Sequence, residues 1–172
     1  MLTIERLTPA LALAFKSARL RALLDSPSAF ASTYASESPR TDAEWADRAA
    51  QMNGDRSTCY LAFDGDDACG IVAGFLDRED ATKAHLVSMW VAPEHRGTGL
   101  GQRLVAMILD WARDRGVRTV YLMVTSNNHG AARFYERLGF TMTGRTEPYP
   151  HDAALLDLEM SRDLHGASPT VG

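Results

Sequence analysis

The spacing of hydrophobic residues changes along this chain, from a helical period in the N-terminal third to short apolar runs after it. Apolar residues recur at helical spacing over 9–26 and again over 41–52. In the second of these helices, Thr41 and Glu44 have the three-residue separation of a capping box. The stretch 26–39 is rich in Ser, Ala and Pro, and the sequence predicts a loop there.

Seven shorter stretches have the composition of β-strands, with turn residues between them. The predicted strands are 2–7, 57–63, 68–76, 84–91, 117–124, 140–144 and 155–160. The stretch 117–124 is almost wholly apolar, which predicts a strand buried on both faces. Two further helices are expected, one at 100–115 with a single apolar face and a short one at 130–138.

These elements predict a single α/β domain of mixed order, with helices on both faces of one sheet. Antiparallel hairpins come first, a strand–helix–strand–helix unit follows, and two strands end the pattern. No repeat or linker divides the sequence, so we expect one domain over 1–165. The tail 166–172 is small and polar, and it is predicted to be disordered.

Composition limits the classes of protein to consider. The formal net charge of -4 at pH 7 gives no basic field of the kind that attracts nucleic acid. Cys59 and Cys69 lie in separate apolar runs without a CxxC pair, which argues against a disulfide framework or a zinc site. No run approaches the roughly 18 apolar residues of a membrane helix, and residues 1–8 lack a signal-peptide pattern. We therefore expect a cytoplasmic protein without a metal, nucleic-acid or membrane partner.

The six residues 96–101 (RGTGLG) connect a predicted strand to a predicted helix. Three glycines let the backbone approach a ligand closely, and the helix start adds unpaired N–H groups and the positive end of a dipole. This arrangement is typical of an anion site, most often one for phosphate. A dinucleotide loop reads G-x-G-x-x-G, and here the third glycine comes one residue early. A mononucleotide loop ends in Gly-Lys-Ser or Gly-Lys-Thr, which Gly101-Gln102-Arg103 does not match.

The pattern that fits is Arg-x-x-Gly-x-Gly, supplied by Arg96, Gly99 and Gly101. With this loop, the segment 91–105 resembles the acyl-CoA pyrophosphate loop of the GNAT acetyltransferase superfamily. The segment 127–140 (NNHGAARFYERLGF) is similar to the second signature of that family. The resemblance implies a mixed, mostly antiparallel sheet of about seven strands, with helices on both faces and a splayed central pair of strands.

The resemblance also implies how acetyl-CoA binds as the acyl donor. The main chain of Met89 and Val91 would hydrogen-bond the pantetheine arm as a neighbouring strand does. Asn128 would bond the same arm or a bridging water. The loop residues implied to hold the pyrophosphate, without a metal, are Arg96, Gly97, Thr98, Gly99, Leu100 and Gly101.

The chemistry implied is direct attack on the thioester by a primary amine of a small molecule or a peptide N-terminus, with no acyl-enzyme. Tyr135 matches the family's tyrosine near the thioester sulfur, so we expect it to be the general acid for the leaving thiolate. The Val91 N–H is a candidate donor to the oxyanion. The general base stays open between a water relay and six side chains: Glu37, Glu44, Asp80, His85, Glu94 and His151.

Simpler roles compete with these assignments. Tyr135 can pack against the sheet as aromatic side chains usually do, and Asn128 can cap the helix that follows it. Trp90 lies on the strand expected to face the thioester and is a candidate for lining an acceptor cleft. For the whole chain, the alternatives are a non-catalytic acyl-CoA-binding regulatory module and a binder of another nucleotide phosphate. The sequence leaves the oligomeric state open, and a homodimer is compatible with the resemblance.

Overall fold

The structure is a computed structural model that describes residues 1–164, so the prediction for the tail at 166–172 lies outside the described residues. Its strands are β1 (Leu2–Arg6), β2 (Ser57–Asp64), β3 (Asp67–Leu76), β4 (Lys83–Val91), β5 (Thr119–Thr125), β6 (Thr141–Pro148) and β7 (Leu156–Asp163). Its α-helices are α1 (Ala12–Asp25), α2 (Tyr34–Glu37), α3 (Asp42–Gln51), α4 (Leu100–Asp114) and α5 (His129–Arg137). Three 3-10 turns complete it: η1 (Pro9–Leu11), η2 (Pro27–Ala29) and η3 (Pro93–His95).

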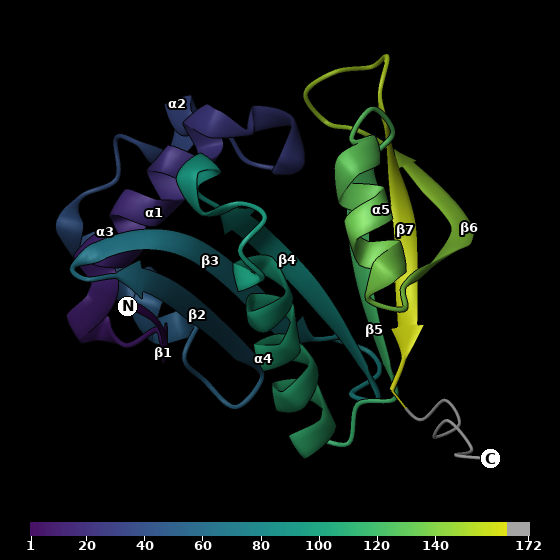
Figure 1. Cartoon of the computed structure of the whole chain (residues 1–172), viewed down its shortest axis with the longest axis horizontal. Helices are drawn as coiled ribbons and strands as arrows, with labels where there is room; N and C mark the ends of the chain where they lie inside the picture. Colours follow the sequence, from purple (N-terminus) through teal and green to yellow (C-terminus); the bar gives the residue numbers. More distant parts are fainter. Residues whose placement is uncertain (165–172) are drawn as a thin grey trace.

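The seven strands form one sheet in the order β1-β2-β3-β4-β5-β7-β6. Every neighbouring pair is antiparallel except β4 and β5, which are parallel. Figure 1 shows α1 and α3 on one face of the N-terminal strands and α4 on the other, with α5 over β5 and β7. The expected fold, a mixed and mostly antiparallel sheet with helices on both faces, is therefore confirmed.

The capping box predicted at the start of α3 is present. Thr41 Oγ1 accepts a hydrogen bond from the Glu44 N–H at 3.2 Å, and the Glu44 carboxylate accepts one from the Thr41 N–H at 2.7 Å. The loop predicted over 26–39 is wrong in part, because η2 and the one-turn helix α2 lie within it. A second capping box, between Thr33 and Ser36, stabilises α2. A four-residue helix is too short to produce a hydrophobic period, so the pattern missed it.

The central strands β4 and β5 are paired at one end and separate at the other. Their pairing covers only three positions, Lys83 with Thr119 through His85 with Tyr121. Beyond this point β4 carries a bulge. On β3, Ala73 is opposite Val87 of β4 and Ile71 is opposite Trp90 of β4, so two residues of β4 lie opposite the single residue between Ile71 and Ala73. Ser88, in the bulge, has a φ of 57°, in the left-handed region. A bulge bends and twists its strand, which takes β4 away from β5 and confirms the splayed central pair.

The prediction that the fifth strand is buried on both faces is wrong. Val120, Leu122 and Val124 are buried with Tyr135 of α5 in the common core, but the alternate residues are not. Tyr121 is only partly buried, and Met123 is 39% exposed. The apolar residues on the second face line a cavity instead of a core, and composition alone does not distinguish these two environments.

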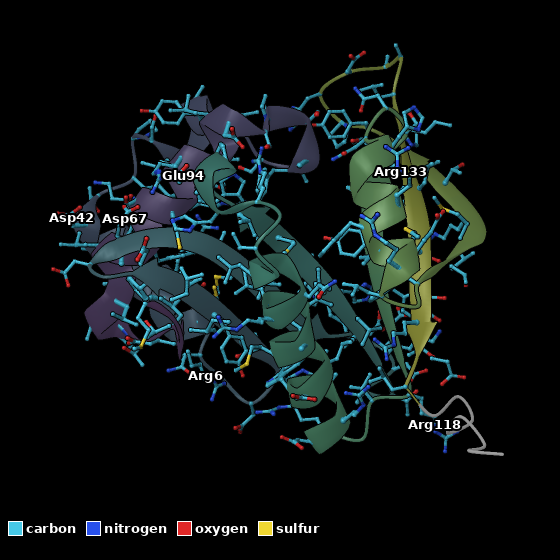
Figure 2. The ribbon with its side chains drawn as sticks, in the orientation of Figure 1. Arg6, Asp42, Asp67, Glu94, Arg118 and Arg133 are labelled. Atoms are coloured by element: carbon cyan, nitrogen blue, oxygen red, sulfur yellow. The ribbon has the colours of Figure 1, made fainter. Side chains whose placement is uncertain are left out.

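The two faces of the N-terminal half are packed tightly against their helices. On one face, Phe15 of α1 and Trp45 of α3 meet edge to face with ring centroids 5.4 Å apart. On the other, a Cβ added to Gly74 of β3 would lie 3.2 Å from the Ile108 side chain, so α4 approaches this strand as closely as glycine allows. Charged side chains, among them Arg6, Asp42, Arg118 and Arg133, lie on the outside (Figure 2). No helix among residues 1–164 is long and apolar enough to cross a membrane.

Candidate functional site

The glycine loop runs from the end of β4 through η3 to the start of α4. Gly97 and Gly99 have φ values of 76° and 86°, which side chains other than glycine rarely adopt, and Gly99 is the N-cap of α4. A Cβ added at either position would meet no atom of residues 1–164 within 4 Å, so these glycines serve the backbone conformation and not a close contact. The first turn of α4 presents its N–H groups beside this loop. The loop therefore has the geometry of an anion cradle.

Gly101 has a different reason to be glycine. A Cβ there would lie 3.1 Å from Phe134 Cζ of α5 and 3.3 Å from Met89 Cε of β4. The start of α4 thus packs directly on the helix and the strand that border the gap between β4 and β5.

Arg96 is bound to the protein at two places. Its Nε donates to the Val91 carbonyl at 3.0 Å, and its Nη2 is bonded to the Asp25 carboxylate at the end of α1. Trp90 Nε1 donates to the same carboxylate at 2.9 Å. Burial raises the pKa of Asp25, but hydrogen bonds from Trp90, Ser26 and Arg96 outweigh it and hold that pKa below its ordinary value. Arg96 is 50% exposed, so its remaining N–H groups are open to a ligand.

A cavity of about 690 Å³, the loop cavity, lies in front of the glycine loop. It brings together eight of the ten residues assigned from the sequence: Met89, Val91, Arg96, Gly97, Gly99, Gly101, Asn128 and Tyr135. Thr98 and Leu100 do not line it, because the Thr98 hydroxyl donates to the His95 carbonyl at 2.6 Å and Leu100 is buried. Only their backbone N–H groups remain available for the role expected of them. Residues that the sequence did not single out, such as Gln102 and Arg137, also line this cavity.

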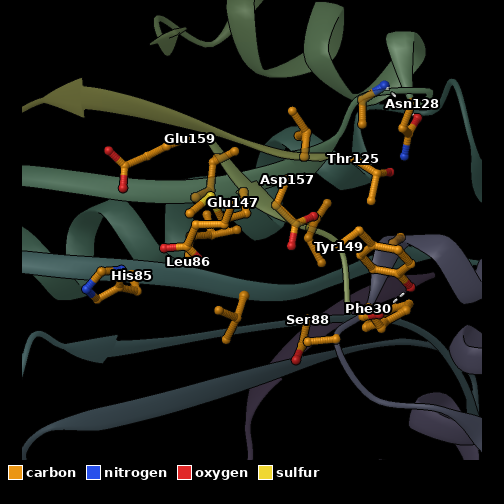
Figure 3. Close-up of a pocket in the computed structure, with 18 of the residues that line it drawn as sticks. Phe30, His85, Leu86, Ser88, Thr125, Asn128, Glu147, Tyr149, Asp157 and Glu159 are labelled. Carbon is orange, nitrogen blue, oxygen red and sulfur yellow. Dashed lines mark hydrogen bonds between the residues drawn. The ribbon is translucent and has the colours of Figure 1, made fainter. Parts of the chain in front are cut away.

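A second cavity of about 630 Å³, the sheet cavity, lies over the face of β5, β7 and β6 that α5 leaves open (Figure 3). Phe30, His85, Tyr149 and Asp157 are among the residues around it. Five residues line both cavities: Ala29, Met89, Asn128, Ala131 and Tyr135. The two cavities therefore meet in the gap where β4 separates from β5.

Tyr135 lies at this meeting point and is only 7% exposed. Its ring packs edge to face against Phe134 and Phe140, with centroids 5.1 and 5.7 Å away. Burial raises the pKa of its phenol, so the group stays protonated at neutral pH and is able to donate a proton. The packing role and the position required of a general acid are thus compatible.

Asn128 is the N-cap of α5, as the simpler interpretation predicted. Its Oδ1 accepts from the Ala131 N–H at 3.2 Å, and its own N–H donates to the Thr125 carbonyl at 2.9 Å. The amide nitrogen of its side chain has no hydrogen-bond partner among the described residues, and it lies in the wall of both cavities. Capping therefore leaves its donor group free for a ligand.

The backbone of Val91 points into the gap. Ala92 N–H donates to the Cys69 carbonyl at 2.8 Å, and the next pair along the ladder is Val91 with Gly70. Hydrogen-bonded and non-hydrogen-bonded pairs alternate in an antiparallel ladder, so the N–H and C=O of Val91 point away from β3. The carbonyl is the acceptor for Arg96, which agrees with this orientation.

Glu37 is excluded as a general base by its partners. Arg19 binds both of its oxygens at 3.0 Å, and Arg48 binds one at 3.2 Å. Burial raises the pKa of Glu37, but the hydrogen bonds and charges around it, chiefly those of Arg19, lower it to about 2. A carboxylate held this strongly in its ionised form is a weak base.

The other candidate bases are mostly occupied elsewhere. Glu44 serves the capping box, and Glu94 shares Arg21 with Asp67 on the outer surface (Figure 2). Asp80 is bonded within its own turn, and the His151 ring contacts the Ala31 carbonyl at 2.5 Å. Of the six candidates, His85 alone lines one of the two cavities, and its Nε2 lies 2.8 Å from the Asp77 carboxylate.

The sequence singled out His85, Asn128 and Tyr135, but not the other polar residues of the sheet cavity. Glu147, Asp157 and Glu159 lie on β6 and β7, and Thr125 lies at the end of β5. They come together only through strand pairing, and none belongs to a recognisable motif. A period-two pattern on β7 was the one signal available, and it was too short to assign to a cavity.

Comparison with known proteins agrees with this geometry. The model of the acetyltransferase (GNAT) family matches residues 20–140, and the chain belongs to this family. Mycothiol acetyltransferase of Mycobacterium avium is 38% identical over an alignment of 116 residues that covers 59% of this chain and 36% of that protein. L-amino acid N-acyltransferase MnaT of Escherichia coli is 34% identical over 58 residues, 34% of each chain. The matched segments thus span little more than a third of these relatives.

Solved structures extend the likeness to the whole fold. The structure of yncA from Salmonella typhimurium with acetyl-CoA has a TM-score of 0.75 at 22% identity, and the match covers 100% of this chain and 99% of that one. An acetyltransferase of the GNAT family from Streptococcus pneumoniae has a TM-score of 0.79 at 20% identity, covering 95% and 99%. These likenesses establish the fold.

Proposed function

We propose that this chain transfers an acetyl group from acetyl-CoA to a primary amine of a small molecule or a peptide N-terminus. The observation that carries this proposal is the meeting of two cavities at the gap between β4 and β5, with Tyr135 in the wall of both. Transfer between two substrates requires that donor and acceptor enter separately and meet at one atom. The acetyl-CoA in the yncA structure and the acyl-transfer names of the relatives support the same reaction.

In this proposal the loop cavity holds the donor. The N–H groups of 97–101 neutralise the pyrophosphate, and Arg96 adds charge beside them. The pantetheine arm lies in the gap, where the main chain of Met89 and Val91 and the free amide nitrogen of Asn128 bind it. No metal is needed in this arrangement, since backbone dipoles and one guanidinium supply the positive field.

The amine enters through the sheet cavity and attacks the thioester carbonyl carbon. The Val91 N–H stabilises the oxygen as it becomes negative. The carbon–sulfur bond then breaks, and the Tyr135 phenol gives its proton to the leaving thiolate. Direct attack fits two cavities that meet, because no side chain has to carry the acetyl group between them.

Replacement of one hydroxyl tests this function. We expect Tyr135→Phe to lower the rate of CoA release about 100-fold, the usual contribution of a general acid. Its affinity for acetyl-CoA, measured by calorimetry, should stay within about twofold of the wild type, because the ring still packs. Tyr34→Phe, on an exposed tyrosine, is the matched control and should change neither quantity.

Two results would contradict the proposal. Unchanged turnover in Tyr135→Phe would remove the general-acid role. Tight binding of acetyl-CoA without thiol release, across a panel of amino acids, aminoglycosides, polyamines and short peptides, would instead identify a non-catalytic acyl-CoA-binding module.

A further inference from the structure

One row of polar side chains crosses the floor of the sheet cavity. Asp157 on β7 is paired with Thr125 on β5 on one side and with Glu147 on β6 on the other. Residues directly opposite each other in antiparallel strands project to the same face, and all three line the cavity (Figure 3). Neighbouring strands are about 5 Å apart. Asp157 is on the strand next to β5, and Glu147 is one strand farther away. The row therefore begins near the gap and leads away from it.

The carboxylates of this wall differ in their partners. Arg145 binds Glu147 at 2.6 Å and lies 3.7 Å from Glu159, which also accepts the Thr143 hydroxyl at 2.9 Å. The Asp157 carboxylate has no hydrogen bond or ion pair with any described residue, although the backbone of Asp157 is paired in the sheet. It is therefore the carboxylate of this cavity that is left to bind a ligand.

Thr125 provides a second and independent observation. It is only 5% exposed, it lines the cavity, and its Oγ1 has no hydrogen-bond partner in the part of the chain that the structure describes. A buried hydroxyl without a partner is costly unless a ligand or water bonds it. Thr125 is the strand partner of Asp157, and its carbonyl accepts the Asn128 N–H beside the gap, so the hydroxyl and the carboxylate lie near the place where the two cavities meet.

We propose that Asp157 and Thr125 bind the acceptor amine as its ammonium ion and that Asp157 is the general base. The inference rests on the proposed acetyl transfer and names the group that prepares its nucleophile. The ammonium gives one proton to the Asp157 carboxylate, and the neutral nitrogen forms its bond to the thioester carbon. The carbon–sulfur bond breaks, and Tyr135 gives its proton to the leaving sulfur. The nitrogen loses its second proton, which restores the proton on the Tyr135 phenol. The acetylated amine and CoA thiol leave, and Asp157 returns its proton to water.

The electrostatics of the wall favour this role. Burial, and then the charge of Glu147, raise the pKa of Asp157, which makes its carboxylate a stronger base. Glu159 from its own strand, Arg145 from β6, Tyr149 from the following loop, Arg19 from α1 and His85 from β4 also face the cavity. Arg19 is neutralised by Glu37, so the cavity as a whole is acidic.

This charge also narrows the class of acceptor. Three carboxylates face one guanidinium on this wall, which attracts cations and repels an acceptor with a carboxylate beside its amine. Three amines with four-carbon chains test the expectation: butane-1,4-diamine, butylamine and 4-aminobutanoate. We expect the diamine to have the highest kcat/KM, about tenfold above butylamine, and 4-aminobutanoate the lowest.

The pH profile of Asp157→Asn distinguishes a base from a merely structural residue. In the wild type, kcat/KM for butane-1,4-diamine should stay flat between pH 7 and 9, because the ionised carboxylate binds the ammonium form. The variant can use only free amine, so its kcat/KM should be about 100- to 1,000-fold lower at pH 7 and rise about tenfold per pH unit. Asp66→Asn, in the exposed β2–β3 turn, is the matched control and should keep the wild-type profile. Thr125→Val should fold normally and raise KM about fivefold.

Other outcomes overturn the inference and are distinguishable from failure of the proposed function. A flat profile or less than threefold loss in Asp157→Asn, or a preference for 4-aminobutanoate, would remove Asp157 while acetyl transfer stands. If the wild type turns over none of the three amines, binding of the diamine to CoA-loaded protein is measured instead. The absence of saturable binding would then remove the role of Asp157. Failure of acetyl-CoA itself to raise the melting temperature would refute the proposed function instead.

Discussion

Removal of the charge on Glu37 is predicted to destabilise the fold and to disturb the gap between β4 and β5. Glu37 is 3% exposed and neutralises Arg19, which is 8% exposed. Arg19 in turn donates from Nη1 to the Ser88 hydroxyl at 2.8 Å, at the residue of the β4 bulge with left-handed φ. Glu37→Gln keeps the shape of the side chain but leaves Arg19 buried beside a neutral group, so its effect measures the charge.

The magnitude follows from the shift in protonation. The pKa of Glu37 falls from an ordinary value of 4.5 to about 2 in the folded protein, against the effect of burial and through the hydrogen bonds and charges around it. At about 1.4 kcal/mol per pKa unit, the ionised form contributes about 3 kcal/mol at neutral pH. Because the folded pKa is lowered, this stability is fully present above pH 4.5 and is lost as the pH falls towards 2.

Urea unfolding at several pH values measures this contribution. Glu37→Gln should lower the free energy of unfolding by about 3 kcal/mol at pH 7, and by less than half of that at pH 3. Asp47→Asn, on an exposed residue of α3, is the control and should cost less than about 0.5 kcal/mol. A loss below about 1 kcal/mol at pH 7, or a loss that does not change with pH, would refute the reasoning.

Two other variants test the glycine loop and the hydrogen bonds of Tyr149 beside the sheet cavity. Gly99→Ala should cost about 1–2 kcal/mol of stability and weaken acetyl-CoA binding, because its φ of 86° is strained for alanine. Gly130→Ala, in open space without positive φ, should leave stability equal or higher, and equal losses in both would contradict the strain argument. Tyr149→Phe removes the hydroxyl within 3.1 Å of the Pro27 carbonyl and 2.9 Å of the Phe30 carbonyl. It should cost about 1 kcal/mol in urea unfolding and raise the acceptor KM, and an unchanged KM would show that this link does not shape the cavity.

Several features of the site could be predicted from the sequence because they depend on residues close together in the chain. The glycines at 97 and 99 set the turn into α4, and Asn128 caps the helix that begins beside it. The same holds for the capping box of α3. The periods of apolar residues predicted the helices and strands, and the resemblance of 91–105 and 127–140 to the GNAT family then implied the fold and the residues of the loop cavity.

The sheet cavity could not be predicted in the same way, because its residues are neighbours only across strands. Asp157 lies beside Thr125 and Glu147 through the register of three strands, and register is decided by packing over the whole sheet. For the same reason, the apolar pattern of β5 gave no sign that one of its faces would be open.

The sequence by itself determined the class of fold and the anion loop, since helix caps, glycine turns and hydrophobic periods act over a few residues. Only the tertiary structure decided what surrounds them. It placed Asp25 against Arg96 and Trp90, enclosed Glu37 between two arginines, and left the Asp157 carboxylate without a partner among residues 1–164. These are contacts between distant segments, and their charges depend on burial, which exists only once the sheet and its helices have packed.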